Sequence, residues 1–111
     1  MTPCDGCGSA TTTRTHRRLP ETLGGRNTHP NLFNACDTCH DKAHTLLGEQ
    51  LGWTLRAGND PAMVPVFRLS DEVWRRDGVV INPNDAVEYL VLVGQIASGL
   101  SNEGGMNGYR R

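Results

Sequence analysis

The sequence has few aromatic residues and no long apolar run. Aromatic residues make up 5% of its 111 residues, and the longest apolar stretch, at residues 89–93, is far too short to cross a bilayer. Residues 1–4 show no basic segment leading into an apolar one, so no secretory signal is predicted. We therefore expect a soluble cytoplasmic protein with no membrane partner, whose small core needs a further source of stability.

Net charge is nearly absent as well. The formal net charge is -1, whereas a protein with a large nucleic-acid footprint usually carries a basic excess. Acidic side chains outnumber basic ones in residues 57–111, which argues against a second large DNA contact there. In the first half of the chain, by contrast, several arginines lie close together: Arg14, Arg17, Arg18 and Arg26.

The sequence does contain two C-x-x-C pairs, CDGC at 4–7 and CDTC at 36–39. A reducing compartment disfavours disulfides and favours thiolate–metal chemistry. Four thiolates close the tetrahedral shell of one structural Zn2+, leave no open position for a substrate, and add on the order of 10 kcal/mol to folding. A redox dithiol and an iron–sulfur cluster are the alternatives. The predicted zinc ligands are Cys4, Cys7, Cys36 and Cys39.

Residues 1–52 are predicted to form an α+β unit around this zinc ion. Short strands are expected at 14–19 and at 32–35, on either side of a segment full of turn-forming residues. That segment, residues 20–30, is predicted to be a long loop.

A helix is predicted after the second strand. Asp37 is expected to cap it and Thr38 to lie at its start, because a short acidic side chain can accept a hydrogen bond from the first turn. Gly48 or Gly52 is expected to end the helix or to separate it from a further turn.

His40 and His44 form an H-x-x-x-H pair on this predicted helix. Residues four apart share one helix face, so both imidazoles can reach one metal ion. Two histidine ligands leave positions open for water and substrate oxygens, as catalysis requires. The alternative is that both are surface histidines of a short polar helix.

Residues 53–100 are predicted to form an extension that packs on the core or on a partner. Short strands are expected at 53–56 and 64–68. Two more, at 72–74 and 79–81, flank an Asp-Gly pair, which is a strong hairpin signal.

The extension is predicted to end in a helix. Asn82 would cap it and Pro83 would occupy its first position. Residues 101–111 are glycine-rich and polar and are predicted to be a flexible tail. Apolar residues at helical spacing predict a core-facing stripe of Ala86, Leu90, Val93, Ala97 and Leu100.

The segment from residue 4 to residue 44 resembles the HNH endonuclease family, in particular its zinc-ribbon-bearing phage and bacterial branch. The resemblance implies a ββα-metal (His-Me finger) core in residues 1–52, in which two antiparallel strands and a helix surround one catalytic divalent ion. GWTLRAGNDPAMVPV, at 52–66, is similar to sequence that follows the nuclease core in phage and actinobacterial members. The motifs that carry the resemblance are CDGC at 4–7, THRR at 15–18, GG at 24–25, NLFNACDTCH at 31–40 and His44.

The resemblance also implies a role for each histidine and for one asparagine. His16 would be the general base on the attacking water, and Asn31 would brace the loop through hydrogen bonds to the backbone. His40 and His44 would hold the catalytic ion, Mg2+, Mn2+, Ni2+ or Zn2+. The ion would polarise the scissile phosphate, and the products would carry 3′-hydroxyl and 5′-phosphate ends.

One position departs from the family pattern. Members commonly carry Asp or His directly before the general base, as a further metal ligand, and here that residue is Thr15. A shift of one residue is the alternative: His16 would then be the ligand and Arg17 would stand where the base belongs. His29 is a candidate substitute ligand from the loop, or a plain turn residue.

The resemblance implies a DNA endonuclease that nicks or cuts both strands. A phage origin would place it in a bacterial host cell, beside the terminase or other packaging proteins. The alternatives are a catalytically weakened HNH-like zinc module that binds nucleic acid or a protein, and a plain zinc-ribbon interaction protein. The sequence leaves the oligomeric state open. Candidate DNA phosphate contacts are Arg14, Arg17, Arg18 and Lys42.

Overall fold

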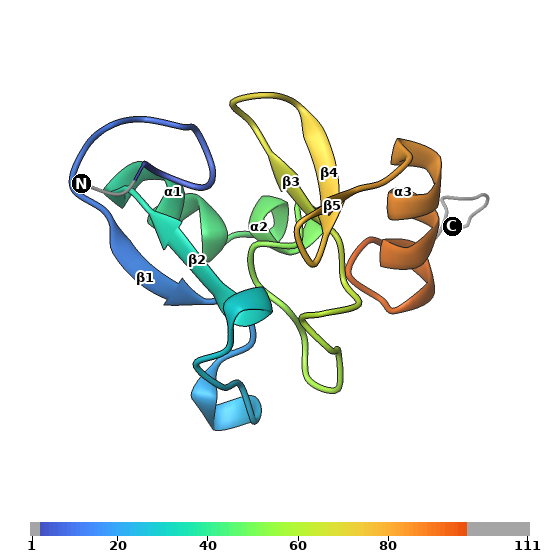
Figure 1. Ribbon diagram of the computed structural model, residues 1–111. Helices are drawn as coiled ribbons and strands as arrows, with labels where there is room; N and C mark the ends of the chain where they lie inside the picture. The colour runs from blue at the N-terminus through green and yellow to red at the C-terminus, as the bar shows by residue number, and fades with distance from the viewer. Residues whose placement is uncertain (1–2, 98–111) are drawn as a thin grey trace.

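Two antiparallel β-sheets and three α-helices make up residues 3–97, the part of the chain that the computed structural model describes (Figure 1). The fold is therefore α+β, as predicted. No helix within those residues combines the length and the apolar character needed to span a bilayer. The first sheet pairs β1 (Arg14–Arg17) with β2 (Leu32–Ala35), and the second has the order β3 (Val66–Arg68), β4 (Val73–Arg76), β5 (Val79–Val80). The helices are α1 (Asp37–Ala43), α2 (Leu46–Gln50) and α3 (Pro83–Leu92).

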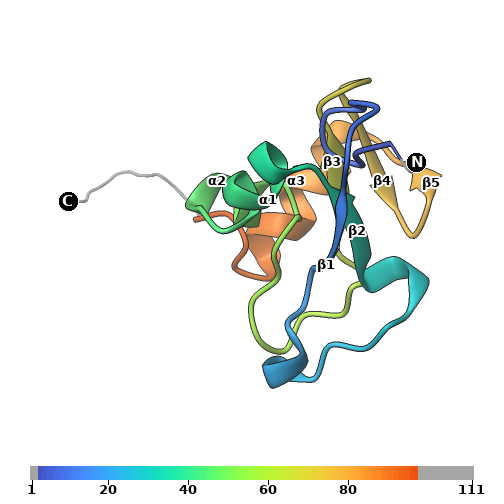
Figure 2. The ribbon, with the colours of Figure 1, turned by 90° about the vertical axis from the view of Figure 1, so that its left-hand side faces the viewer.

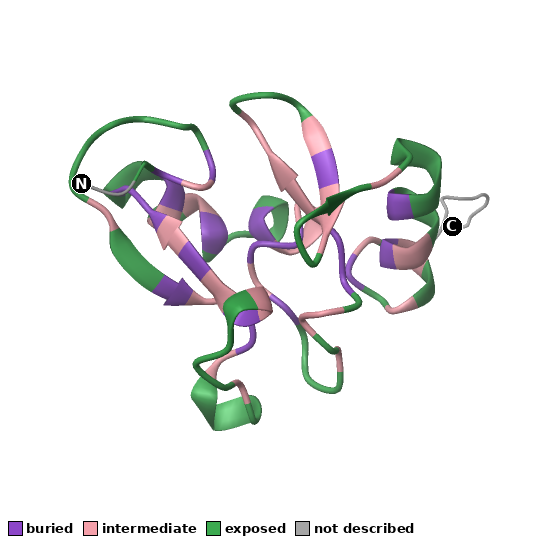
Figure 3. Cartoon of the chain, viewed as in Figure 1, coloured by how far each residue is buried: buried purple, intermediate pink, exposed green. Residues whose placement is uncertain are grey.

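β1 and β2 lie where the sequence predicts strands, but β1 stops at Arg17 instead of residue 19. The reason is that Leu19 bonds to a side chain instead of to a strand. Its N–H lies 2.7 Å from Asn31 Oδ1, and its carbonyl oxygen lies 3.1 Å from Asn31 Nδ2. The loop between the strands contains two short 3-10 turns, Glu21–Leu23 and His29–Asn31, and is exposed for most of its length (Figure 3).

α1 starts one residue earlier than predicted, and Asp37 does not cap it. Asp37 lies in the first turn, and Cys36 takes the cap position without a side-chain capping hydrogen bond. The residue before the helix is fixed instead by the cysteine cluster described below. In Figure 2, α1 and α2 lie on one side of the β1–β2 pair, and β4 and β5 lie on the other.

The predicted single helix is divided in two before Gly48. Thr45 caps α2, and its hydroxyl oxygen accepts a hydrogen bond from the Gly48 N–H at 3.4 Å. A Cβ atom at Gly48 would lie 2.2 Å from the carbonyl oxygen of Ala43, so glycine lets α2 approach the end of α1. Gly52, with φ +77, then leads the chain away from α2.

Residues 53–56 are not a strand, contrary to the prediction. Trp53 and Leu55 are 0% and 2% exposed, so this segment runs through the interior. Its N–H groups bond to scattered partners: Trp53 N to Gly48 O at 2.8 Å and Leu55 N to Arg18 O at 2.7 Å. Within residues 3–97, no β-strand pairs with this segment. Its alternating apolar residues instead pack into two different hydrophobic clusters.

The second sheet follows the predicted hairpin closely. Asp77 and Gly78 form its turn with φ of 49° and 82°, as an Asp-Gly turn between antiparallel strands requires. The strand predicted at 64–68 is shorter than expected, since β3 begins only at Val66. The preceding residue, Pro65, has no N–H to offer to a ladder.

α3 begins as predicted and ends early. The Asn82 side chain accepts a hydrogen bond from the Asn84 N–H at 2.8 Å, and Pro83 opens the helix. The helix ends at Leu92 because Gly94 adopts a left-handed conformation, φ +81. Residues 101–111, predicted as a flexible tail, lie outside the described residues. Of the predicted stripe, Ala86 and Leu90 are buried, Val93 is half-buried, Ala97 is exposed and Leu100 lies outside the described residues.

Two small hydrophobic clusters form the interior. Trp53 belongs to the first and Leu55 to the second, so the irregular segment at 53–56 joins them. The first consists of Cys4, Phe33, Ala35, Cys36, Cys39, Ala43 and Trp53. The second consists of Leu19, Leu55, Val64, Trp74, Ala86 and Leu90.

Arg18 lies in the interior, and the prediction that it contacts DNA phosphate is wrong. The residue is 3% exposed. Burial lowers the pKa of its guanidinium to about 10, so the group stays charged at neutral pH. Its guanidinium donates hydrogen bonds to carbonyl oxygens of loops that have no neighbouring strand to bond to. At 2.7–2.9 Å it donates to the carbonyl oxygens of Gly52, Pro30, Pro61 and Val64.

We expect Arg18→Met to lower the free energy of unfolding by about 3 kcal/mol or more, because it leaves several buried carbonyl groups unpaired. Arg14→Met is the matched control: it removes an exposed ion pair with Asp37, worth less than about 1 kcal/mol. Urea denaturation of zinc-loaded protein measures both. Equal losses in the two variants would contradict the structural role of Arg18.

Candidate metal centres

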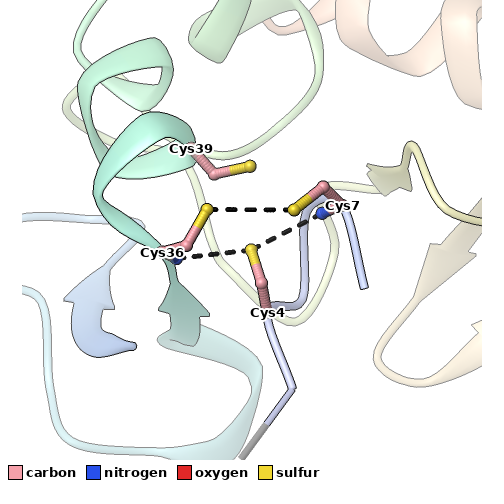
Figure 4. A group of neighbouring side chains, drawn as sticks. All are labelled: Cys4, Cys7, Cys36 and Cys39. Carbon is pink, nitrogen blue, oxygen red and sulfur yellow. Dashed lines mark hydrogen bonds between the residues drawn. The ribbon is translucent and has the colours of Figure 1, made fainter. Parts of the chain in front are cut away.

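Four cysteine side chains converge between the N-terminal loop and the start of α1, as the spacing predicts (Figure 4). Their sulfur atoms all lie within 4.8 Å of one another. Cys7 Sγ and Cys36 Sγ are 3.8 Å apart, and two sulfurs bound to one tetrahedral zinc ion at 2.3 Å are separated by about 3.8 Å. The donor set and its spacing therefore fit a structural metal ion such as zinc. The converging residues are Cys4, Cys7, Cys36 and Cys39.

Backbone N–H groups prepare Cys4 for metal binding. Its sulfur accepts from the N–H groups of Gly6 at 3.3 Å, Cys7 at 3.5 Å and Cys36 at 3.3 Å. Burial raises the pKa of the Cys4 thiol, but these donors outweigh it and lower the pKa to about 6. Cys39 has the opposite balance, because burial raises its pKa. A cation between the sulfurs offsets the cost of holding Cys39 as a thiolate.

Two residues inside the first C-x-x-C turn fix the knuckle. A Cβ atom at Gly6 would lie 2.9 Å from Cys39 Sγ and 2.9 Å from the Trp53 ring, so glycine is required there. Asp5, which the sequence reasoning missed, joins the knuckle to β2. Its carboxylate accepts from the Asn34 N–H at 2.8 Å, and its own N–H donates to the Asn34 carbonyl at 2.7 Å.

Three histidines form a second cluster. His16 comes from β1, His40 from α1, and His44 from the residue that ends α1. One nitrogen of each lies within 4.8 Å of the others, and the ring centroid of His16 is 5.3 Å from those of His40 and of His44. His40 Nε2 and His44 Nε2 are 3.4 Å apart, close to the separation of about 3.3 Å for two nitrogens on one tetrahedral zinc.

His16 is held in one tautomer by acceptors. The ring is 7% exposed, and its Nε2 lies 3.0 Å from the carbonyl oxygen of Trp53 and 3.2 Å from Thr54 Oγ1. A carbonyl oxygen only accepts, so Nε2 carries the proton and Nδ1 of the neutral ring keeps a lone pair. Burial, together with His40 and His44, lowers the pKa of His16 to about 4. The ring is therefore neutral at neutral pH, and its second nitrogen offers a lone pair to a proton or a metal.

His40 also favours a neutral ring. Partial burial and the neighbouring His44 lower the pKa of His40. Neutral imidazoles suit zinc, nickel and other borderline cations. Two or three such ligands leave coordination positions free for water and for a substrate oxygen.

Asn31 lies apart from the histidine rings and holds the loop between β1 and β2. It is 0% exposed, and its Nδ2 donates to the carbonyl oxygen of Arg26 at 2.9 Å in addition to the bonds with Leu19. Thr15, next to His16 in β1, faces away from the cluster, since successive strand residues point to opposite sides. Its hydroxyl donates to Asn34 Oδ1 at 3.3 Å. His29 is exposed in the loop and is not part of the cluster.

The remaining candidate DNA contacts lie near the surface around α1. Arg14 is exposed and pairs with Asp37 at 2.9 Å. Arg17 is half-buried and donates to Asn27 Oδ1 at 2.8 Å. Lys42 lines an open hollow of about 630 Å³ beside the cysteine cluster.

α1 joins the two clusters. Cys36 takes the cap position before the helix, Cys39 and His40 lie next to each other within it, and His44 ends it. Comparison with models of protein families, with curated proteins and with solved structures gives no match.

We expect wild-type protein to retain one zinc ion per chain after dialysis and Cys39→Ser to lose it. With one thiolate missing the shell cannot close, and the small core around the cysteines loses much of its stability. Metal analysis and the absorption of cobalt-substituted protein measure this. His40→Ala is the control, since it leaves the cysteine cluster intact. Retention of tightly bound zinc by Cys39→Ser would contradict the four-cysteine shell.

Proposed function

We propose that this protein is a metal-dependent DNA endonuclease of the HNH type. The observation that carries the proposal is the three-histidine cluster: His40 and His44, spaced for one ion, lie beside the buried His16. The antiparallel pairing of β1 with β2, followed by α1, supports the proposal of a ββα-metal core. The phage, bacterial-host and packaging context implied by the sequence resemblance belongs to this same proposal.

In this proposal His40 and His44 hold a divalent ion, which supplies polarisation of the scissile phosphate and neutralises charge on the leaving oxygen. His16 Nδ1 accepts a proton from the attacking water while Nε2–H remains bonded to Trp53. The water oxygen forms the new bond to phosphorus, and the bond from phosphorus to the 3′-oxygen breaks. The leaving oxygen takes a proton from solvent, giving a 3′-hydroxyl and a 5′-phosphate.

DNA would approach over the exposed side of α1 and β1. Arg14, Arg17 and Lys42 are the cations available there, and phosphate contact would require Arg14 to give up its pair with Asp37. With so few cations the footprint is small, so the proposed enzyme binds DNA backbone with little sequence preference.

A catalytically weakened module that binds nucleic acid or a protein is the second candidate. The orientation of Thr15 supports it, because this residue leaves His40 and His44 without the extra ligand common in the family. Low net charge supports it too. The two candidates differ in whether phosphodiester bonds are cut.

We expect purified protein to cut supercoiled plasmid in the presence of Mg2+, Mn2+, Ni2+ or Zn2+. His16→Ala and His40→Ala should each lower the rate by about 100-fold or more, in the range lost with a general base or an essential ligand. His29→Ala is the matched control and should cut normally, because His29 lies outside the cluster. Cutting that persists in both cluster variants would identify a contaminant and refute the proposal.

Metal affinity separates the two roles open to His16. If His16 is the base, His16→Gln keeps the affinity for a second metal and loses cutting, whereas His40→Ala loses both. Isothermal titration of zinc-loaded protein with Mn2+ or Ni2+ measures this affinity. An equal loss of affinity in the two variants would assign His16 as a third ligand instead.

A further inference from the structure

Thr54 lies beyond the nuclease-like segment of residues 4–44 and contacts both sides of the histidine cluster. Its hydroxyl donates to the carbonyl oxygen of Ala43 at 2.6 Å, at the end of α1 and next to His44. The same oxygen lies 3.2 Å from His16 Nε2. A hydroxyl has one hydrogen, so with Ala43 as acceptor it offers His16 a lone pair. One side chain thus contacts both β1 and the end of α1.

Trp53 adds a second acceptor to the same ring nitrogen. Its carbonyl oxygen lies 3.0 Å from His16 Nε2. The residue is 0% exposed, and its indole Nε1 donates to the Phe67 carbonyl at 2.7 Å, so packing fixes this part of the backbone. Both partners of Nε2 are acceptors, and together they specify a ring with the proton on Nε2.

Gln95, just beyond α3, holds the backbone of this segment. The side chain is 1% exposed and uses all of its hydrogen-bonding capacity. Nε2 donates to the carbonyl oxygens of Thr54 at 2.8 Å and Glu49 at 2.9 Å. Oε1 accepts from the Arg56 N–H at 2.7 Å and from Asn59 Nδ2 at 2.8 Å. This pattern fixes the orientation of the amide, since a flipped group would place oxygen against two carbonyls.

We infer that Thr54 is a positioning residue for His16. It fixes the Nε2–H tautomer of that ring and the place of the ring beside His40 and His44, and Gln95, just beyond α3, holds the backbone of Thr54. The catalytic consequence rests on the proposed nuclease function, but the tautomer does not. The role of the extension follows: it carries the groups that orient a histidine of the N-terminal sheet.

The tautomer is measured by NMR of protein labelled with isotopic nitrogen in histidine, because protonated and unprotonated ring nitrogens resonate far apart. Zinc-loaded wild-type protein without a second metal should show His16 with a proton on Nε2 alone, and His16→Gln identifies the signals. A proton on Nδ1 in the wild type overturns the inference without recourse to any variant.

Thr54→Val removes the hydroxyl at nearly constant volume and leaves the Trp53 carbonyl as the remaining acceptor of Nε2–H, so a share of the Nδ1–H tautomer should appear beside the Nε2–H form. Thr54→Ser should restore the wild-type signals. Thr28→Val is the matched control, since Thr28 is exposed in the loop and its side chain makes no capping hydrogen bond. If valine disturbs folding, Thr54→Ala serves in its place. Wild-type tautomer signals in the folded variant without the hydroxyl overturn the role of Thr54.

Kinetics provide the second measurement. Thr54→Val should lower kcat for plasmid cutting by about tenfold or more, the range for residues that orient a ligand or base, and leave DNA affinity unchanged. Thr54→Ser should recover most of the rate, which a loss of general stability would not do. An unchanged kcat overturns the catalytic consequence. If the wild type cuts nothing, the nuclease proposal fails while the NMR result still decides the position of the proton.

Gln95→Glu tests the link to the extension. The glutamate keeps the acceptor for Arg56 and Asn59 but has no hydrogen to donate to the carbonyl groups of Thr54 and Glu49. We expect a tautomer mixture at His16, with Gln50→Glu on α2 as control. Unaltered His16 signals in Gln95→Glu would separate the extension from the site and overturn that part of the inference.

Discussion

Four sulfur atoms meeting at one point are the constraint on which the first half of the structure depends. Residues 3–13 form no helix or strand, so the N-terminal loop is held by its cysteines, by the hydrogen bonds of Asp5 and by the close packing of Gly6. The same four sulfurs fix the first turn of α1. Because His40 follows Cys39 directly, the geometry of the four sulfurs also sets the position of the His40–His44 pair.

In the irregular segments of this chain, buried polar side chains supply the hydrogen bonds to backbone groups that neighbouring β-strands supply in larger proteins. Arg18, Asn31 and Gln95 are nearly or fully buried, and each bonds to backbone groups of irregular segments. Buried carbonyl and N–H groups need partners. The strands are short and the chain is poor in aromatic residues, so these side-chain hydrogen bonds are what allow long loops to cross the interior. Arg18 and Gln95 join parts of the chain distant in sequence, and Arg18 thereby couples the end of β1 to the extension.

Short-range signals were sufficient for much of the fold. The cysteine spacing predicted the convergence of four sulfurs, Asp77-Gly78 predicted the hairpin, and Asn82-Pro83 predicted the start of α3. The hairpin and the start of α3 depend on neighbours within a few residues. The two C-x-x-C turns are equally local, and their meeting across the chain was predicted because four thiolates can share one metal ion. The failures involve distant contacts. Residues 53–56 show a strand-like alternation because they pack between two cores, and Arg18 shows a charge that suggests a surface.

The histidine cluster divides in the same way. His40 and His44 share a helix face, which spacing reveals. The tautomer of His16 depends on Trp53 and Thr54, and their placement depends on Gln95, far along the chain. No local sequence pattern indicates that a glutamine after a helix will hold a distant loop by hydrogen bonds. The polar residue within an apolar segment, buried at 1% exposure, becomes informative only once its four partners are known.

The position of Gln95 has a consequence for the order in which the protein matures during synthesis. The cysteine cluster can close once residue 39 has left the ribosome, so α1 and its histidines can be ordered early. The segment at 53–56 that orients His16 lacks its hydrogen bonds to Gln95 until residue 95 emerges and α3 folds against β4. A nascent or prematurely terminated chain could therefore close its cysteine cluster while lacking the finished histidine arrangement, which forms only after residue 95 has emerged.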